Sequence, residues 1–509
     1  MSAAELGILI ASQARLLREA GAGTAALAGA AQTAAEDMDL AAMVGDVIPE
    51  VVLVAGGVAV LLYALFAPRR LQPVAALLAL LTVVLAAAVT VAMLGGDEYL
   101  TFSDTYARDG VALWAKLIVL VTTAGVIGLS VSWFRRDPRH GEYYTMLLFS
   151  ALGAILLAGA TDLKEFVVAM LLSSVTGFVL AAYHRRSSLA SEAAIKYFLL
   201  GAFTSASMLI GTAYIYGLAG STTLPGLSQG LPGGGAALVA GSALVVVALA
   251  FKMGAVPAHA WMPDVAQGSP APVSAFITSA PKVGALIFLA RLVVSYPSGS
   301  LDWAAAVAVI SAATMTLGNL AALWQDDVRR LLGWSAISQT GYGLMAIVAL
   351  GRSDLAVPAL LFFLLAYVLG NVAAFGVVVE LRGLTELGAY SGLARAHAWL
   401  MNALAISFLS FIGIPPLAGF FAKLVLFAAA IEAGYTWLAV VAVVNTVVSI
   451  AYYARVLAPA YFGDLRAPVP VLGRWAEVAT LSFAFALIAV GILAEPFLDA
   501  FASAGLLPA

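Results

Sequence analysis

The chain has 509 residues, of which 63% are hydrophobic and 10% are charged, and its mean hydropathy is +1.01. Soluble domains carry about 25% charged residues, so this composition excludes a soluble protein. The net charge of −3 is too small to indicate a class of partner, and we expect contacts with lipid and protons and none with nucleic acid.

The chain contains no cysteine, and its four histidines lack the spacing of metal ligands. Disulfides, thiolate metal sites and cysteine-ligated iron–sulfur clusters are therefore excluded. We expect no cofactor and no metal on this chain.

Residues 1–45 are rich in alanine and include Arg15, Arg18 and Glu36. They lack the basic start, apolar core and small-residue cleavage site of a secretory signal. We predict an N-terminal extension, either soluble or a surface helix.

Apolar runs long enough to cross the hydrocarbon, about 20 residues each, recur from Val47 to Phe497. Backbone groups in lipid must pair within their own segment or in a closed barrel, and these runs are too long and too uniformly apolar for barrel strands. The sequence predicts an all-α polytopic membrane protein with about fourteen transmembrane helices, at 47–67, 74–95, 112–133, 144–161, 163–183, 194–217, 236–257, 272–296, 303–323, 328–350, 355–381, 398–428, 434–460 and 476–498.

Arginines concentrate in the loops that follow odd-numbered spans, and short cytoplasmic loops are the ones that carry this excess. Both termini are therefore predicted on the non-cytoplasmic side of a bacterial plasma membrane. The arginines concerned are Arg69, Arg70, Arg135, Arg136, Arg139, Arg185, Arg186, Arg329, Arg330, Arg382, Arg395, Arg466 and Arg474.

Two spans contain helix breakers. The seventh ends at Gly254 and Pro257, and the twelfth contains Gly413-Ile414-Pro415-Pro416. Proline removes a backbone donor and clashes with the preceding turn, so both helices are expected to break. Matching breaks predict two inverted five-helix repeats with the ion path nearby. The expected parts are an extension (1–45), helices 1–3 (46–143), a first repeat (144–297), a second repeat (298–462) and helix 14 with a tail (463–509).

Four lysines interrupt apolar runs, at Lys196, Lys252, Lys282 and Lys423. A charge near the bilayer centre costs about 2.5–3.5 kcal/mol, so such residues indicate function. A lysine suits a proton relay because burial can bring an amine's pKa toward neutral, whereas arginine stays protonated. Lys196 lies near the start of its span, where pairing or snorkelling to the interface is the alternative. Lys116 is expected at the interface.

Two further polar residues follow the seventh span. His259 could carry protons, since the ordinary histidine pKa lies near 6.5, or could be a hydrogen-bonded structural residue. Asp264 follows Pro263 and is expected to cap or pin the loop that leads to the eighth span.

Residues 251–265, Phe-Lys-Met-Gly-Ala-Val-Pro-Ala-His-Ala-Trp-Met-Pro-Asp-Val, continue through 268–273 to Pro281-Lys282. This block resembles the signature of the antiporter-like membrane subunits of NADH:quinone oxidoreductase (respiratory complex I), and within them the subunit N group. Supporting blocks lie at 141–150, 192–202, 327–332 and 413–423, and the likeness runs from about Ile48 to Phe462.

The resemblance implies fourteen helices with two inverted five-helix repeats, and a place in the membrane arm beside other complex I subunits. Lys252 and Lys282 would relay protons in the first half-channel and Lys423 would serve the exit side. NADH, FMN, iron–sulfur clusters and quinone would belong to partner subunits.

One position departs from the family, which usually carries a glutamate in the fifth span where this chain has Leu171. That carboxylate is thought to pair with the first relay lysine. Glu165 lies six residues earlier, about 600° around the helix, and is expected to point elsewhere.

Three functions remain open on the sequence. The first is a proton-translocating subunit of complex I. The second is a subunit of a multisubunit cation/proton antiporter, which shares the fold and the lysines. The third is a non-pumping scaffold paralogue, motivated by Leu171.

Overall fold

A computed structural model describes residues 40–135, 137, 141–184, 187–382, 384–465 and 471–508. The chain divides into two units, residues 1–48 and 49–509. Within the first, the structure describes one short helix, α2 (Leu40–Asp46), so most of the predicted extension at 1–45 lies outside the described residues. Five of the arginines behind the predicted orientation, at 136, 139, 185, 186 and 466, also lie outside them.

The first half of the helical unit alternates long helices with short connecting elements. Its elements are α3 (Ile48–Phe66), η1 (Arg69–Leu71), α4 (Val74–Met93), β1 (Tyr99–Thr101), β2 (Tyr106–Arg108), α5 (Gly110–Trp133), α6 (Gly141–Gly159), α7 (Leu163–Ala181), α8 (Ser188–Ala219), α9 (Leu224–Gly230), α10 (Ala236–Met253), α11 (Trp261–Gly268), α12 (Ala271–Ile277) and α13 (Ala280–Val294).

The second half has the same character and continues to the C-terminal segment. Its elements are α14 (Trp303–Ala322), α15 (Val328–Ala349), α16 (Ala356–Glu380), η2 (Leu387–Tyr390), α17 (Leu393–Ala396), α18 (Ala398–Ile412), α19 (Ala418–Glu432), α20 (Thr436–Phe462), α21 (Arg474–Ile492) and α22 (Ala494–Ala502).

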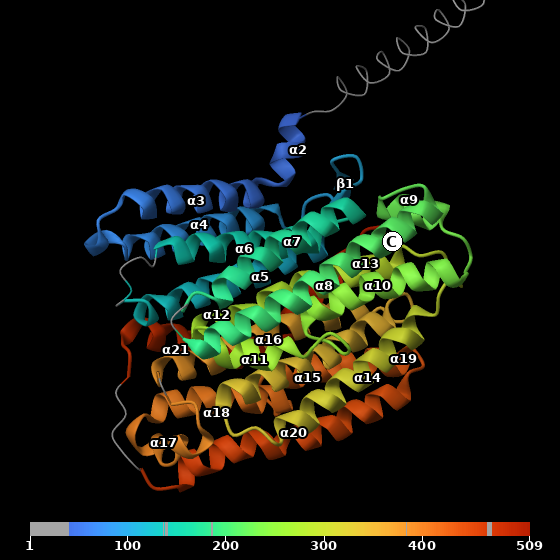
Figure 1. Cartoon of the computed structure of the whole chain (residues 1–509). Helices are drawn as coiled ribbons and strands as arrows, with labels where there is room; N and C mark the ends of the chain where they lie inside the picture. The colour runs from blue at the N-terminus through green and yellow to red at the C-terminus, as the bar shows by residue number, and fades with distance from the viewer. Residues whose placement is uncertain are drawn as a thin grey trace, which may run out of the picture. The chain divides into compact units, whose positions relative to one another are not determined.

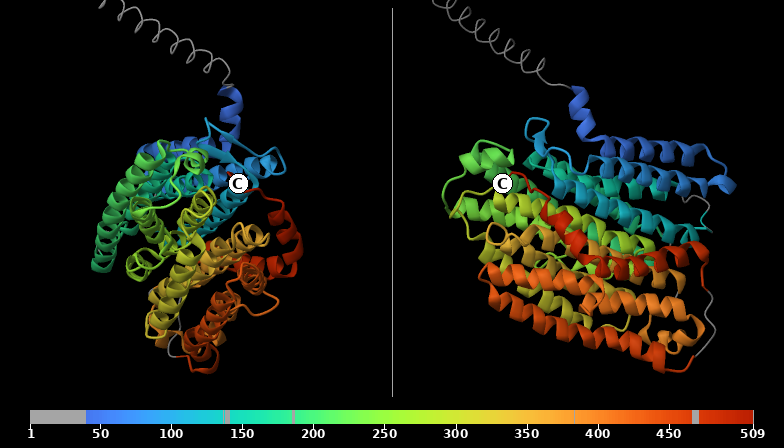
Figure 2. Two further views of the ribbon diagram at one scale, coloured as in Figure 1. Left: turned by 90° about the vertical axis from the view of Figure 1, so that its right-hand side faces the viewer. Right: turned by 180° about the vertical axis from the view of Figure 1, so that it is seen from behind.

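The long helices of this unit run side by side, from α3 and α4 at one edge to α20 at the other (Figure 1). Seen from behind, the red helix α21 runs across the front, with orange helices below it, and it packs on α5, α16 and α18 (Figure 2). Among the candidate membrane spans of the described residues, α12 with α13 and the helix α16 are the most enclosed, and they form the centre of the core.

Twelve helices among the described residues are long and apolar enough to cross a membrane. The membrane-embedded, all-α architecture is thus confirmed, while the count of fourteen and the inverted repeats stay predictions. The other two of the fourteen expected spans are also helical, although they are not among the twelve. The span at 328–350 is α15, a helix whose buried face carries Ser335, Ser338 and Thr340, and the span at 398–428 is divided into α18 and α19.

Both predicted helix breaks are present. The helix α10 ends at Gly254 with φ of 73°, and α18 ends at Gly413 with φ of 93°, so each break begins in the left-handed region that glycine tolerates. A third interruption, which the sequence analysis did not predict, separates α12 from α13 at Thr278 and Ser279.

A short two-stranded β-hairpin accompanies the helices. The strands β1 and β2 pair antiparallel, with Tyr99 opposite Arg108 and Thr101 opposite Tyr106. We call the end of the helical unit that holds this hairpin and residues 503–508 the hairpin end.

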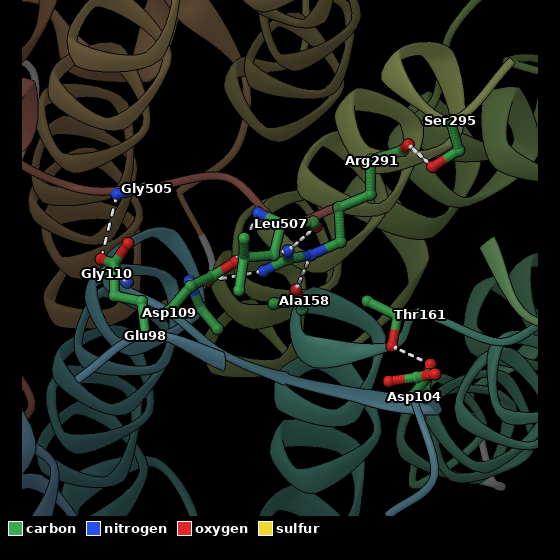
Figure 3. Close-up of polar contacts among 11 residues, drawn as sticks. Glu98, Asp104, Asp109, Gly110, Ala158, Thr161, Arg291, Ser295, Gly505 and Leu507 are labelled. Atoms are coloured by element: carbon green, nitrogen blue, oxygen red, sulfur yellow. Dashed lines mark hydrogen bonds and ion pairs between the residues drawn. The ribbon is translucent and has the colours of Figure 1, made fainter. Parts of the chain in front are cut away.

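A buried ion pair fastens this end (Figure 3). Arg291 of α13 donates from Nη1 and Nη2 to the two oxygens of Asp109 at 2.6 and 2.8 Å, and both side chains are fully buried. Arg291 also donates to the carbonyls of Ala158, at 2.9 Å, and Leu507, while the Leu507 amide donates to Asp109. The pair therefore ties α5, α6, α13 and the C-terminal segment together.

Candidate proton-relay site

Lys252 lies in the last turn of α10, directly before the first break, and is 1% exposed. Its Nζ donates to Oγ of Ser174 on α7 at 3.1 Å. A hydroxyl can accept from an ammonium and can donate to a neutral amine, so this contact is compatible with both charge states of the lysine.

The backbone freed by the first break is satisfied by neighbouring helices. Thr340 of α15 donates to the Met253 carbonyl at 2.8 Å, and the Val256 amide donates to Thr314 of α14 at 3.1 Å. Irregular backbone at membrane depth persists only where protein or a cavity satisfies it in this way. A methyl group on Gly254 would lie 2.2 Å from Cε of Met262, so a side chain here would displace the end of that methionine.

Lys282 lies in the first turn of α13, which follows the third interruption, and is 1% exposed. Its Nζ donates to the Ala336 carbonyl at 2.6 Å and to the Tyr367 hydroxyl at 3.2 Å, and it lies 4.5 Å from the centre of the Tyr367 ring. The amine is therefore held by a hydroxyl, a carbonyl and an aromatic face.

Two side chains of α16 satisfy the interruption before Lys282. Tyr367 donates to the Thr278 carbonyl at 2.7 Å, and Asn371 donates to Oγ1 of Thr278 at 2.8 Å. Because Tyr367 contacts both the interruption and the lysine, it fixes where the amine lies.

Thr340 connects the first two lysines. Its Oγ1 lies 2.8 Å from the Met253 carbonyl, next to Lys252, and 3.0 Å from the Ala336 carbonyl, which accepts from Lys282. This threonine is fully buried on α15, beside the first break.

Lys423 lies on α19, directly after the second break, and is 4% exposed. Its Nζ donates to the Ile412 carbonyl at 3.3 Å and to Oγ1 of Thr446 at 3.2 Å. It also lies 4.1 Å from the centre of the Tyr342 ring, and the Tyr342 hydroxyl is 3.0 Å from Thr446.

A small cavity borders the third lysine and Tyr367, the hydroxyl partner of the second lysine. It is lined by Tyr367, the partner of Lys282, and by Lys423 itself, together with Gln339, Phe411 and Gly419. The three lysines thus follow one another through α10, α13 and α19, with Thr340 and this cavity between them.

Within the described residues, the other two sequence candidates make no hydrogen bond with the three lysines. Lys196 is 46% exposed and pairs with Glu192 at 2.6 Å and with Asp264 at 2.9 Å. Asp264 lies within α11 and also pairs with Arg330, so it joins helices where a loop cap was expected. His259 is partly buried, with its ring 5.8 Å from that of Trp334.

Leu171 is 36% exposed on α7, and Ser174, one turn later, faces Lys252. A carboxylate at 171 would therefore lie at the surface of this chain. The serine is the side chain of α7 that holds the lysine.

The hydroxyl partners Ser174, Tyr367 and Thr446 were missed by the sequence analysis, because serine, threonine and tyrosine within apolar runs are common and carry no mark of their own. Thr340 was missed as well, although a signal was available there, since the run of Ser338, Gln339 and Thr340 is too polar for a lipid-facing segment.

The three amines have no acidic partner. Among the residues that the structure describes, no carboxylate lies within 4.0 Å of Lys252, Lys282 or Lys423, although other buried cations have one. Groups of three or more side chains that could hold a metal ion are likewise absent from the described part of the chain. The chemistry open to these three amines is to gain and lose protons.

Residues 160–449, more than half of the chain, match the family model described as NADH:quinone oxidoreductase/Mrp antiporter, TM. The chain is 42% identical over 430 residues to NADH-quinone oxidoreductase subunit N of Mycobacterium sp. (strain JLS), covering 81% of this chain and 90% of that one. It is 40% identical over 463 residues to subunit N 1 of Streptomyces griseus, covering 90% and 98%.

Solved structures agree. A chain of respiratory complex I from Thermus thermophilus matches with a TM-score of 0.78 and 34% identity, over 90% of this chain and all of that one. A chain of the Mrp complex from Dietzia sp. matches with a TM-score of 0.78 at 21% identity, over 92% and 97%, which shows a shared fold. The chain therefore belongs to the NADH:quinone oxidoreductase/Mrp antiporter transmembrane family.

Proposed function

We propose that this chain is a proton-translocating membrane-arm subunit of an NADH:quinone oxidoreductase, and that protons pass along Lys252, Lys282 and Lys423. The observation that carries the proposal is the burial of three amines, each beside a helix break and each held by a hydroxyl with no carboxylate within ion-pair distance among the described residues. A permanently charged, unpaired lysine in this setting would be costly, so exchange of the proton is what makes the arrangement useful.

The geometry suggests how the charge moves. When one amine gains a proton, its positive charge disfavours a second positive charge nearby and drives the neighbouring proton onward. The hydroxyls of Ser174, Tyr367 and Thr446 keep a hydrogen bond to each amine in either state, so neither charge state leaves its partner unsatisfied.

Energy for this movement comes from partner subunits in the proposal. NADH, FMN, the iron–sulfur clusters and quinone would bind there, and this chain would hold no redox cofactor. The chain would lie in a bacterial plasma membrane with both termini on the non-cytoplasmic side, beside other membrane-arm subunits.

The alternative is a subunit of a multisubunit cation/proton antiporter. The relatives at 42% and 40% identity are named as NADH-quinone oxidoreductase subunits, whereas the Mrp complex chain is similar at 21%, so the first function is favoured. Sodium-dependent pumping without any dependence on NADH oxidation would favour the antiporter.

The test uses the intact complex in proteoliposomes and measures protons pumped per NADH oxidised. Lys252→Met and Lys423→Met should each lower this ratio, and Lys252→Arg should do the same, because arginine keeps the charge but cannot release its proton. The control is Arg395→Met, which removes an exposed cation that pairs with Asp464 at the surface. If the ratio is unchanged in both methionine variants, the chain does not pump along these lysines, and the non-pumping scaffold role is favoured.

A further inference from the structure

A second group of buried charges lies at the hairpin end, away from the three relay lysines. Lys116 of α5, expected at the interface, is 1% exposed, and its Nζ lies 2.7 Å from Oε1 of Glu50 on α3. The Glu50 side chain is 6% exposed. Burying an ion pair costs desolvation free energy, so a buried pair indicates a role beyond stability.

Tyr106 of the hairpin completes the contact. Its hydroxyl donates to Oε1 of Glu50, and its ring lies 5.1 Å from Nζ of Lys116. The pKa of Tyr106 is held well above its ordinary value, by burial first and by the negative charge of Glu50 second, so this hydroxyl remains a donor. The ring can approach because Gly159 has no side chain, and a methyl group there would lie 2.3 Å from Cζ of the ring.

One atom in the group is left without a partner. Oε2 of Glu50 is buried, and no hydrogen-bond donor among the described residues reaches it. An ionised oxygen in this position is costly, whereas a protonated one is neutral. The carboxyl group therefore has a free oxygen at which a proton can bind.

The charges that face this group do not balance. Asp109 is paired with Arg291, Asp162 lies 3.7 Å from Lys164, and Glu50 is paired with Lys116. Glu165 of α7, which is partly exposed and lies close enough to Glu50 and Lys116 to interact electrostatically, has no cation of its own within ion-pair distance among the described residues. The titratable groups are Glu50 on α3, Tyr106 on β2, Asp109 directly before α5, Lys116 on α5, Asp162 directly before α7, Lys164 and Glu165 on α7, and Arg291 on α13.

We propose that Glu50 and Glu165 share one exchangeable proton beside Lys116 and form a proton-binding site through which protons enter or leave the chain at the hairpin end. This proposal rests on the proposed function, since the site would be the port, the place where the protons relayed by the lysines enter or leave the chain. Glu165 reaches the surface and Glu50 holds the buried oxygen, so a proton can pass from one to the other.

The chemistry is a proton transfer between two carboxyl groups. An O–H bond breaks at Glu165 and another forms at Oε2 of Glu50, and Lys116 keeps its own proton throughout. Protonation of Glu50 weakens its attraction to Lys116, while Tyr106 still supports Oε1 and the amine. The site therefore holds the proton in either position with one negative charge beside one positive charge.

The experiment compares infrared spectra of the intact complex, from wild type and from Glu165→Gln, across pH. A protonated carboxyl group has its own C=O band, and we expect the variant to lose one such band that is present in wild type. Glu50→Gln should lose the same band, because both residues hold the one proton. Glu98→Gln, which removes an exposed carboxylate at the same end, should keep it.

Retention of the band in Glu165→Gln would overturn the proposal. Should Glu50→Gln fail to assemble, Glu165→Gln still decides the matter, because Glu165 makes no ion pair within the described residues whose loss would unfold the protein. Proton pumping per NADH in Glu165→Gln is expected to fall several-fold at alkaline pH, where the site must capture protons from a dilute supply.

Lys252→Met separates this proposal from the relay. If that variant loses pumping and keeps the carboxyl band, the relay and the port are both supported. If it keeps pumping, the relay fails, while the band in Glu50→Gln and Glu165→Gln still reports on proton binding at the hairpin end.

Discussion

Two kinds of buried cation coexist in this chain. Arg291 at the hairpin end is fully paired, with two bonds to Asp109, whereas Lys252, Lys282 and Lys423 contact hydroxyls, carbonyls and aromatic rings. A carboxylate holds its cation in the charged state, and a hydroxyl accommodates either state. The paired arginine is thus suited to fastening helices and the unpaired lysines to exchanging protons.

The largest effect on stability should follow from breaking the ion pair between Arg291 and Asp109. Arg291→Met would leave Asp109 buried and uncompensated, which costs about 3–5 kcal/mol. Because the pair also holds Ala158 and Leu507, we expect loss of the membrane arm's thermal stability and poor assembly. The thermal unfolding temperature of the purified complex measures the stability, and native gels measure the assembly.

The matched change among the unpaired cations is Lys282→Met, which removes an amine and leaves no buried carboxylate behind. It should assemble normally. Equal loss of assembly in the two variants would show that pairing does not distinguish these cations.

A smaller effect should follow from giving a relay lysine the carboxylate that it lacks. Leu171→Glu places a carboxylate one turn from Ser174, and two charges about 10 Å apart interact by about 1.7 kcal/mol at an effective dielectric constant of 20. This attraction favours the charged form of Lys252, so the pH profile of coupled turnover should move upward by about one unit.

The control for that change is Leu171→Gln, which has the same size and polarity without the charge. Turnover of the two variants, measured from acid to alkaline pH, separates charge from shape. Superimposable profiles would mean that position 171 does not act on Lys252 through charge.

Much of this contrast could be predicted from the sequence. Lysines and prolines stand out within apolar runs, so Lys252, Lys423 and the breaks at Gly254 and Gly413 were predicted where the structure has them. The interruption before Lys282 was not predicted, although Pro281 was a signal, since proline is tolerated in the first turn of a helix.

The partners of the lysines could not be predicted, because they come from distant parts of the chain. Ser174 is 78 residues from Lys252, and Tyr367 is 85 residues from Lys282. The same reason explains Lys116, expected at the interface from its place near the start of a span. Glu50 and Tyr106 cover it, and only tertiary packing brings them there.

The smallest effect should come from removing a hydroxyl partner. Ser174→Ala takes away the hydrogen bond to Lys252, and such a bond contributes about 1 kcal/mol, which corresponds to about a five-fold change in an equilibrium. We expect the complex to assemble with unchanged stability and coupled turnover to fall by about that factor. Ser174→Thr keeps the hydroxyl and should restore most of the rate.

The pair of variants bears directly on how a buried amine exchanges its proton. If the hydroxyl serves both charge states, its loss penalises both, and turnover falls at every pH without a change in the shape of the profile. If it stabilises the charged form alone, Ser174→Ala should instead shift the profile toward lower pH, because the neutral amine would then be favoured. A shift of that kind, seen in alanine and absent in threonine, would contradict the view that hydroxyl partners accommodate the amines in either state.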